Sequence, residues 1–189
     1  MYLKKPFVLW FTGLPCSGKT TLSNKIKKEL NAYGLNPEQL DGDSVRQKKA
    51  VALGYSKEDR MANVTEVVSQ TSDFMQNGII TLVSLISPYN QMREYARQKV
   101  GDFVEIYVRC PLKVCETRDV KGMYRLAREG KIKHFTGVSD PYEEPADPEL
   151  VVETDLLTIE ASANKVMRYL KNRELIPSRS SQKIAYAFR

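Results

Sequence analysis

The chain has 189 residues, enough for one domain that buries a sizeable core around a single sheet. Hydrophobic residues make up 42% of it and charged residues 28%, as in ordinary globular proteins, and no apolar run reaches the roughly 18 residues of a membrane span. The net charge of +6 is concentrated at the C-terminal end, where residues 165–189 carry seven Lys and Arg against one acidic residue. The lack of a long apolar run excludes a membrane-spanning protein. Because the rest of the chain is electrically balanced, its charge does not favour binding of nucleic acid by the body of the protein.

The N-terminal residues lack the pattern of a cleavable signal peptide, so we expect a cytoplasmic protein with no membrane partner. The three cysteines, Cys16, Cys110 and Cys115, cannot all pair, which favours reduced thiols. The single histidine, His134, stands apart from them, which argues against a structural metal site. Residues 173–189 form a basic tail that is either solvated or, through its apolar last residues, an arm that docks on a neighbouring subunit.

The first predicted element is a buried strand over residues 7–11, and a phosphate-binding loop follows it at once. Gly13 and Gly18 let the backbone curl so that its N–H groups point at phosphates, Lys19 neutralises these, and Thr20 offers a hydroxyl to Mg²⁺. Apolar positions in residues 21–30 predict a helix whose positive end faces the anion. The alternative is a Gly-rich turn that matches by accident. We expect MgATP to contact Gly13, Leu14, Pro15, Cys16, Ser17, Gly18, Lys19, Thr20 and Thr21.

Strand and helix signals then alternate, which predicts an α/β fold in three layers, a mostly parallel sheet with helices on both faces. Ser56 with Asp59 three residues later predicts a helix start. The remaining strands are expected at residues 38–40, 79–86, 103–108 and 151–152, and the remaining helices at 57–76, 88–100, from 111, and 159–171.

The segment between Val120 and Pro148 is rich in Lys, Arg, Gly and Pro and has little apolar periodicity, which is typical of a mobile lid in a nucleotide kinase. The sequence therefore divides into a P-loop kinase domain, residues 1–172 with a lid at about 120–148, and the basic C-terminal tail, residues 173–189. Lys121, Arg125 and Arg128 either close over the transferring phosphates or form an exposed basic surface.

Ligands of such sheets gather beyond the carboxyl ends of the strands, where we expect four polar clusters to converge on one cleft. Asp41 and Asp43, separated by a glycine, can hold the water shell of a metal or accept a proton from an acceptor hydroxyl, and Asp43 is our choice for the latter. The alternative is an ordinary Asp-Gly turn. Arg46, one turn on, can grip an anionic substrate.

Arg60 and Asn63 lie three residues apart on the helix predicted over 57–76, so they share a face and can contact one ligand. The alternative is a solvated helix start. Phe135 stands without apolar neighbours in a polar stretch, so it either stacks on a base or pins the lid to the core.

Taken together, these clusters resemble adenylylsulfate kinase over about residues 8–169. The resemblance implies a P-loop kinase that uses MgATP to phosphorylate the ribose 3′-hydroxyl of adenylyl sulfate, commonly as a homodimer. Its most specific parts are the phosphate loop and the segments 40–46, 54–60 with Asn63, 86–89, 115–124, 132–137 and 140–143.

The resemblance also implies roles for individual residues. Asp43 is the base, with Lys19 and Asp41 assisting, and Thr20 and Asp41 lie at the metal. Ser87 matches a possible phosphoenzyme site, but we place it first in the pocket wall. The residues implied for the acceptor are Asp41, Asp43, Arg46, Tyr55, Arg60, Asn63, Ile86, Ser87, Lys121, Lys133, Phe135 and Thr136, of which Tyr55 and Phe135 enclose the adenine, and Arg118 lies near the ATP base.

Two other functions remain open. Thr65 and Glu66 stand where family members usually carry two arginines, which motivates a related kinase acting on another nucleotide anhydride, such as a cytidine-type acceptor, or on a small metabolite hydroxyl. The alternative outside the enzymes is a non-catalytic nucleotide sensor, or an RNA-associated module that uses the basic tail.

Overall fold

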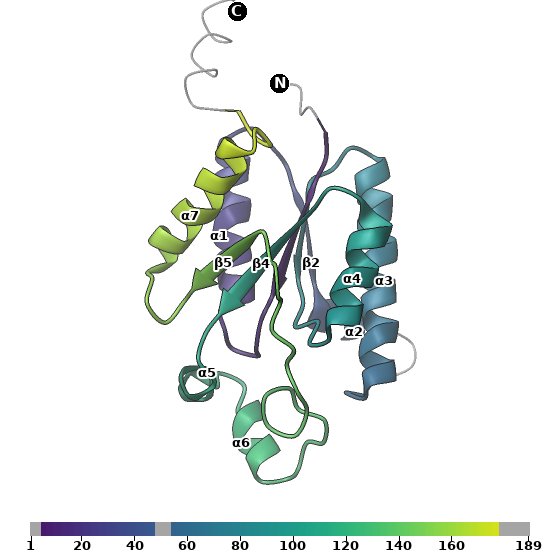
Figure 1. Cartoon of the computed structure of the whole chain (residues 1–189), viewed down its shortest axis with the longest axis vertical. Coiled ribbons are helices and arrows are strands. Elements are labelled where there is room, and N and C mark those ends of the chain that lie inside the picture. The colour runs from purple at the N-terminus through teal and green to yellow at the C-terminus, as the bar shows by residue number, and fades with distance from the viewer. Residues whose placement is uncertain (1–4, 48–53, 178–189) are drawn as a thin grey trace, which may run out of the picture.

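The structure is a computed structural model that describes residues 5–47 and 54–177. Within these residues, five strands form one sheet in the order β2-β3-β1-β4-β5, and every neighbouring pair is parallel. The α/β architecture predicted from the alternation of elements is therefore confirmed (Figure 1). The strands are β1 (Val8–Thr12), β2 (Glu38–Asp41), β3 (Thr81–Ser84), β4 (Phe103–Arg109) and β5 (Leu150–Glu153).

Helices cover both faces of the sheet and complete the three layers (Figure 1). One face carries α1 (Lys19–Ala32) and α7 (Ile159–Asn172), and the other carries α3 (Lys57–Gln76) and α4 (Asn90–Val100). The short helices α2 (Gly42–Gln47), α5 (Leu112–Arg118) and α6 (Met123–Arg128) lie toward the carboxyl ends of the strands. Within the described residues, no helix is long and apolar enough to cross a membrane.

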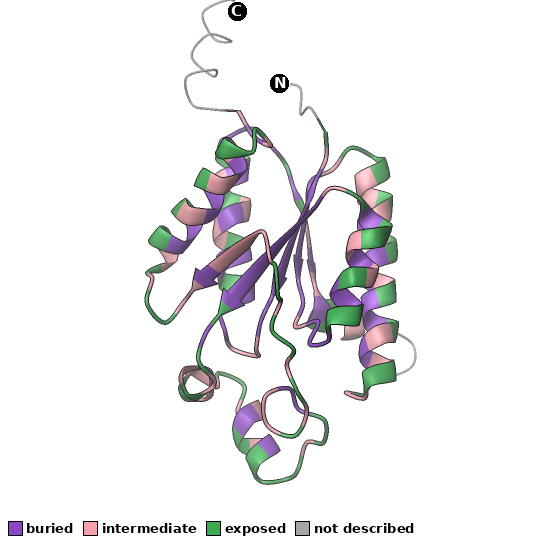
Figure 2. Cartoon of the chain, viewed as in Figure 1, coloured by how far each residue is buried: buried purple, intermediate pink, exposed green. Residues whose placement is uncertain are grey.

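The central strand supplies both layers of the core because successive side chains of a strand point to opposite faces. Leu9 and Phe11 pack into the cluster with the apolar stripes of α1 and α7, whereas Val8 and Trp10 pack into the cluster with α3 and α4. All five residues of β1 are buried, as Figure 2 shows for the centre of the sheet. This burial fixes the carboxyl end of β1, from which the phosphate loop emerges.

The helix start predicted at Ser56 is confirmed in detail. The Ser56 side chain accepts a hydrogen bond from the Asp59 backbone N–H at 3.1 Å, and the Asp59 carboxylate accepts one from the Ser56 N–H, which together make a capping box. The helix that follows spans residues 57–76, as the apolar spacing predicts.

Three details differ from the sequence-based expectations. The third strand ends at Ser84 rather than at 86, because the chain turns toward Ser87, whose φ is +40°. The lid contains a helix, α6, because Tyr124 and Ala127 lie on one face of it and pack against Phe135. The core also extends past residue 172, since Ile176 is 3% exposed and belongs to the cluster around α7.

Candidate active site

The phosphate loop has the backbone that its glycines predict. Gly13 and Gly18 have φ values of +150° and +99°, and a Cβ on Gly13 would lie 2.4 Å from the carbonyl oxygen of Val108 on the adjacent strand β4. The loop is therefore packed too closely against the sheet for any side chain at position 13. Ser17 is fully buried, and its Oγ has no hydrogen-bond partner among the described residues, so a polar group is available inside the loop.

Lys19 begins α1 and folds back over the loop, where its Nζ donates hydrogen bonds to the carbonyls of Gly13 and Leu14 at 3.0 and 2.7 Å. Its side chain is buried, and this burial lowers the pKa of Lys19 to about 8 against the opposing fields of nearby groups such as Asp43. A buried ammonium held only by carbonyls is poorly balanced electrostatically. Anionic phosphates would provide the charge that this lysine lacks.

Thr20 and Asp41 form the pair of oxygen ligands expected for magnesium. The Thr20 hydroxyl donates to Asp41 Oδ2 at 3.0 Å, while Asp41 Oδ1 accepts from the backbone N–H of Asp43 at 3.0 Å. One carboxylate thus caps α2 and reaches the phosphate loop at the same time. No group of three or more His, Cys, Asp or Glu residues in the described ranges is arranged to hold a metal ion. A hydroxyl and a carboxylate still fit Mg²⁺, which takes its other ligands from water and phosphate.

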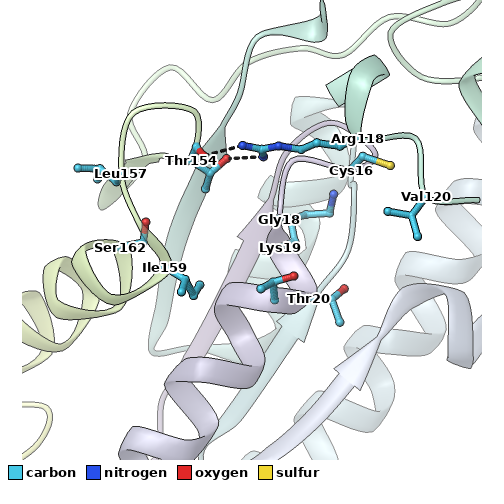
Figure 3. Close-up of a pocket in the computed structure, with 11 residues that line it drawn as sticks. Cys16, Gly18, Lys19, Thr20, Arg118, Val120, Thr154, Leu157, Ile159 and Ser162 are labelled. Carbon is cyan, nitrogen blue, oxygen red and sulfur yellow. Dashed lines mark hydrogen bonds between the residues drawn. The ribbon is translucent and has the colours of Figure 1, made fainter. Parts of the chain in front are cut away.

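One cavity lies beside the phosphate loop, toward α7, with a volume of about 490 Å³ (Figure 3). Arg118 crosses its upper edge and donates to the backbone oxygen of Thr154 at 2.7 Å and to its hydroxyl at 3.3 Å. Thr154 in turn donates to the Ser17 carbonyl at 2.7 Å, which ties the wall of the cavity to the loop. The other lining residues include Gly18, Lys19, Thr20, Thr21, Leu157, Ile159 and Ser162.

A second cavity, of about 480 Å³, lies on the other side of the loop and is lined from α2, α3, β3 and the lid. Arg60 and Asn63 project into it from α3 and are 5% and 1% exposed. Their burial removes the alternative of a solvated helix start. Asn63 Nδ2 donates to the Gly42 carbonyl at 3.3 Å, and its buried Oδ1 has no partner among the described residues. Other residues that line this cavity are Asp41, Asp43, Arg46, Tyr55, Ile86, Lys121 and Phe135.

The two cavities meet at the phosphate loop, because Cys16, Lys19, Thr20 and Val120 line both of them. Lys19 and Thr20 therefore stand between two compartments of similar volume. Such an arrangement can hold a phosphate donor and an acceptor on opposite sides of one lysine and one metal ligand.

Comparisons with known proteins agree with this geometry. A family model described as adenylylsulphate kinase matches residues 5–153. The chain belongs to the adenylylsulphate kinase family. An adenylyl-sulfate kinase of Halothermothrix orenii is 47% identical over 173 residues, 92% of this chain and 94% of that one. Another, from Picosynechococcus, is 51% identical over 162 residues, 86% of this chain and 92% of that one. The structure of Mycobacterium tuberculosis APS kinase in complex with AMPPNP and APS has a TM-score of 0.84 at 36% identity and covers 88% of this chain and 98% of that one.

Most of the site residues that the sequence predicts come together around the two cavities. Asp43 lies at the start of α2, where Lys121 from the lid donates to its Oδ2 at 2.9 Å. The hydrogen bond to Asp43 raises the pKa of Lys121. The centroid of the Tyr55 ring lies close to two guanidinium groups, 5.0 Å from that of Arg46 and 5.6 Å from that of Arg60. Arg46 also donates to the Gly54 carbonyl.

Phe135 pins the lid to the core, one of the two roles that its sequence context left open, and its stacking on a base stays a prediction. It is 5% exposed, packs edge-on against Tyr124 of α6 at 5.0 Å between ring centroids, and also lines the second cavity. The apolar partners that its flanking residues lack come from α6, about ten positions earlier in the chain. An aromatic wall is therefore present on the lid side of that cavity.

Three predicted contact residues lie elsewhere. Ser87 does not line the cavity, because its side chain is turned inward, where it accepts from Trp10 Nε1 at 3.1 Å and donates to Thr12 Oγ1 at 3.1 Å. Lys133 is exposed on the lid, and Thr136 is fully buried, so neither lines the cavity. The expectation that these side chains face the acceptor is thus not met in this structure.

The other lid cations and the two unusual residues of α3 also lie apart from the cavities. Arg125 forms an ion pair with Glu129 at 3.3 Å, and Arg128 forms one with Glu116 at 2.5 Å. In this structure both arginines therefore belong to an exposed surface and do not close over the phosphate site. The Thr65 hydroxyl donates to the Met61 carbonyl, and the Glu66 carboxylate accepts from Gln70, and neither residue lines either of these two cavities. The departure at residues 65–66 therefore leaves the walls of the cavities unchanged.

Sequence reasoning missed one wall of the first cavity. Thr154 follows β5 directly, and Leu157, Ile159 and Ser162 come from the turn and helix after it. The same rule that located the polar clusters after the other four strands applies to the fifth, so Thr154 was detectable from the sequence. The apolar and hydroxyl residues of α7 carry no comparable pattern.

Proposed function

We propose that this protein transfers the γ-phosphoryl group of MgATP to the 3′-hydroxyl of adenylyl sulfate and forms 3′-phosphoadenylyl sulfate and ADP. The observation that carries this proposal is the pair of nucleotide-sized cavities that meet at Lys19 and Thr20. The first cavity is assigned to ATP and the second to the acceptor. Membership of the family and the similarity to a kinase bound to AMPPNP and APS support the same assignment.

The donor side is built to hold a triphosphate. The N–H groups of the loop from Gly13 to Gly18 and the ammonium of Lys19 bind the phosphates, and Lys19 exchanges its carbonyl partners for phosphate oxygens. Thr20 and Asp41 would hold magnesium. When bound, this ion offsets the charge that develops on the transferring group. The base of ATP lies between Arg118 and the side chains of Leu157 and Ile159.

The acceptor side combines cations with aromatic rings. Arg46, Arg60 and Asn63 bind the phosphosulfate end, since a buried guanidinium and amide recognise anionic oxygens by direct hydrogen bonds. Tyr55 and Phe135 enclose the adenine, which requires the Tyr55 ring to exchange its guanidinium neighbours for the base. Lys133 and Thr136 complete the site only if the lid changes its position when the acceptor binds.

Asp43 receives the proton of the 3′-hydroxyl. Its carboxylate is 64% exposed and is paired with Lys121 through Oδ2, so Oδ1 can accept the proton while this pair persists. Release of the pair when the acceptor binds would let Lys121 approach the transferring phosphoryl group. Catalysis would come mainly from the positioning of two substrates and from charge stabilisation, with direct transfer between them. The inward-facing hydroxyl of Ser87 fits a role in supporting the site rather than as a phosphorylated intermediate.

A substrate panel tests the proposed function. Purified protein is incubated with MgATP and, separately, adenylyl sulfate, cytidine nucleotides and small sugars, and ADP formation is followed. We expect adenylyl sulfate to have the highest kcat/KM by at least roughly tenfold, because only it offers both an adenine and a terminal anion to the second cavity. A higher kcat/KM for any other acceptor would transfer the function to that substrate class. ATP binding without turnover of any acceptor would favour a nucleotide sensor.

We further propose that the protein acts as a cytoplasmic homodimer, with residues 1–172 as the kinase domain, a lid at about 120–148 and residues 173–189 as a basic tail, the start of which packs on the core through Ile176. The family resemblance supports the dimer, and free thiols at Cys16, Cys110 and Cys115 suit a reducing compartment. Light scattering on the full chain and on a chain ending after Pro177 gives the mass of each particle. Equal monomeric masses would refute the dimer, and a mass that falls on truncation would assign the tail to the interface.

A further inference from the structure

Asp140, in the lid segment, lies where three walls of the acceptor cavity join. Its Oδ2 accepts a hydrogen bond from the Tyr89 hydroxyl at 2.8 Å, next to the start of α4, and lies 3.8 Å from Nε of Arg60 on α3. Its backbone N–H donates to the Phe135 carbonyl at 3.1 Å, and its carbonyl accepts from Gly137 at 2.7 Å. One residue thus connects α3, α4 and the loop that carries Phe135.

The Arg60 guanidinium is held on several sides. Its Nε donates to the Tyr55 carbonyl at 2.9 Å, and its Nη2 donates to the His134 carbonyl at 2.7 Å. His134 has a φ of +55°, a left-handed conformation that costs energy in a residue with a side chain and that here orients its carbonyl. These two carbonyls accept hydrogen bonds from Nε and Nη2. Nη1 is the nitrogen that forms no hydrogen bond with the described residues.

Asp140 is also the main counter-charge of this arginine. The Arg60 side chain is 5% exposed and that of Asp140 is 12% exposed. Burial lowers the pKa of Arg60, and among the opposing effects the field of Asp140 is the largest. A guanidinium buried to this extent is costly without a nearby carboxylate. The carboxylate itself does not line the cavity, so its effect on a ligand must pass through Arg60.

We propose that Asp140, clamped by Tyr89, is a positioning residue that aims the free edge of Arg60 at the terminal anion of the acceptor. This inference rests on the proposed function insofar as the acceptor carries an anionic group. Asp140 acts on acceptor binding alone, because it lies on the acceptor side and contacts nothing in the cavity assigned to ATP.

Simple electrostatics predicts the opposite sign, which makes the inference testable. Removal of a carboxylate close to an anion site would strengthen anion binding if charge were all that mattered. Removal of a positioning group weakens binding, because the guanidinium loses its fixed direction. The direction of the change in acceptor KM therefore separates the two effects.

The experiment compares Asp140→Ala, Asp140→Asn and Tyr89→Phe with wild type by initial rates. We expect Asp140→Ala to raise the KM for adenylyl sulfate roughly tenfold, the equivalent of about 1.4 kcal/mol, with the KM for MgATP within twofold of wild type. Asp140→Asn keeps an oxygen for the Tyr89 hydroxyl and should restore part of the loss, while Tyr89→Phe should raise the acceptor KM about threefold. The matched control is Asp147→Ala, an exposed aspartate of the same segment, which should change neither KM.

A double-mutant cycle with Arg60→Ala completes the test. If Asp140 acts through Arg60, Asp140→Ala should add no further rise in acceptor KM to the Arg60→Ala protein. Additive effects, an unchanged or lower acceptor KM in Asp140→Ala, or an equal rise in both KM values would overturn the inference. Failure of the proposed function would instead be seen in wild type, as no turnover of adenylyl sulfate. The cycle would then be run with whichever anionic nucleotide the substrate panel identifies. If no anionic nucleotide were turned over, both the proposed function and the inference on Asp140 would be refuted.

Discussion

Lys19 is expected to lower the free energy of unfolding of the protein when no nucleotide is bound. Its pKa is lowered from the ordinary value of 10.5 to about 8, chiefly by burial. At about 1.4 kcal/mol per pKa unit, the charged ammonium costs about 3–4 kcal/mol of folding free energy. The variant Lys19→Met removes this cost but also loses the hydrogen bonds to Gly13 and Leu14, worth roughly 1 kcal/mol each. Without nucleotide at pH 7, its free energy of unfolding should therefore exceed that of wild type by about 1–2 kcal/mol.

The pH dependence gives the sign of the effect. Below pH 8 the lysine is protonated in both folded and unfolded protein, so the full cost is present. Between pH 8 and pH 10.5 the folded protein has released this proton while the unfolded chain keeps it, so the free energy of unfolding of wild type rises with pH. From pH 7 to about pH 9.5, the advantage of Lys19→Met should shrink by about 2 kcal/mol.

Urea denaturation at both pH values measures this difference, with Lys25→Met as the matched control. Lys25 lies on the same helix in a surface pair with Glu29, so its replacement should change the free energy of unfolding by less than about 0.5 kcal/mol. Saturating MgATP should stabilise wild type and not Lys19→Met. A Lys19→Met protein that is less stable than wild type at pH 7, or an advantage that does not change with pH, would refute the reasoning.

Three further variants separate the parts of the site. Asp43→Asn should lower kcat by roughly 10²- to 10⁴-fold with the affinity for ATP within twofold, as initial rates and calorimetry would record, because the proton acceptor is lost and the donor cavity is not. Arg118→Ala should raise the KM for MgATP roughly fivefold, with the acceptor KM unchanged, since it removes the bonds to Thr154 that form the donor wall. Gly13→Ala should lower the melting temperature by roughly 5–10 °C in calorimetry and abolish stabilisation by ATP, because its Cβ would lie 2.4 Å from the Val108 carbonyl.

Each of these expectations has a contradicting result. A normal kcat for Asp43→Asn would remove Asp43 from the role of base. If Arg118→Ala changed the acceptor KM more than the ATP KM, the assignment of the two substrates to the two cavities would be reversed. A Gly13→Ala protein with an unchanged melting temperature would mean that the loop is not packed against β4 in solution.

The features that the sequence predicts correctly depend on neighbours in the chain. The buried run of β1, the glycines of the phosphate loop and the capping box at Ser56 and Asp59 each lie within a few residues, so local geometry decides them. Asp41 and Asp43 were predicted from their place after a strand, since parallel strands bring their carboxyl ends to one edge.

The features that sequence reasoning missed depend on distant partners. Ser87 looks like a pocket residue beside Ile86, but Trp10 and Thr12 of a neighbouring strand bind its hydroxyl and turn it inward. Arg125 and Arg128 resemble phosphate ligands until their acidic partners are placed in space. The role inferred for Asp140 likewise exists only because Arg60 and Tyr89, 80 and 51 positions away in the chain, fold against it.

The position of the transferred phosphate tests the central claim most directly. Purified protein is given ATP labelled at the γ-phosphate together with adenylyl sulfate and magnesium, and the labelled product is characterised by mass and by phosphorus NMR. We predict one label per ADP formed, located on the ribose 3′-oxygen of adenylyl sulfate. Label on any other oxygen, or ADP formed at the same rate without adenylyl sulfate, would contradict transfer between two nucleotides across Lys19 and Thr20.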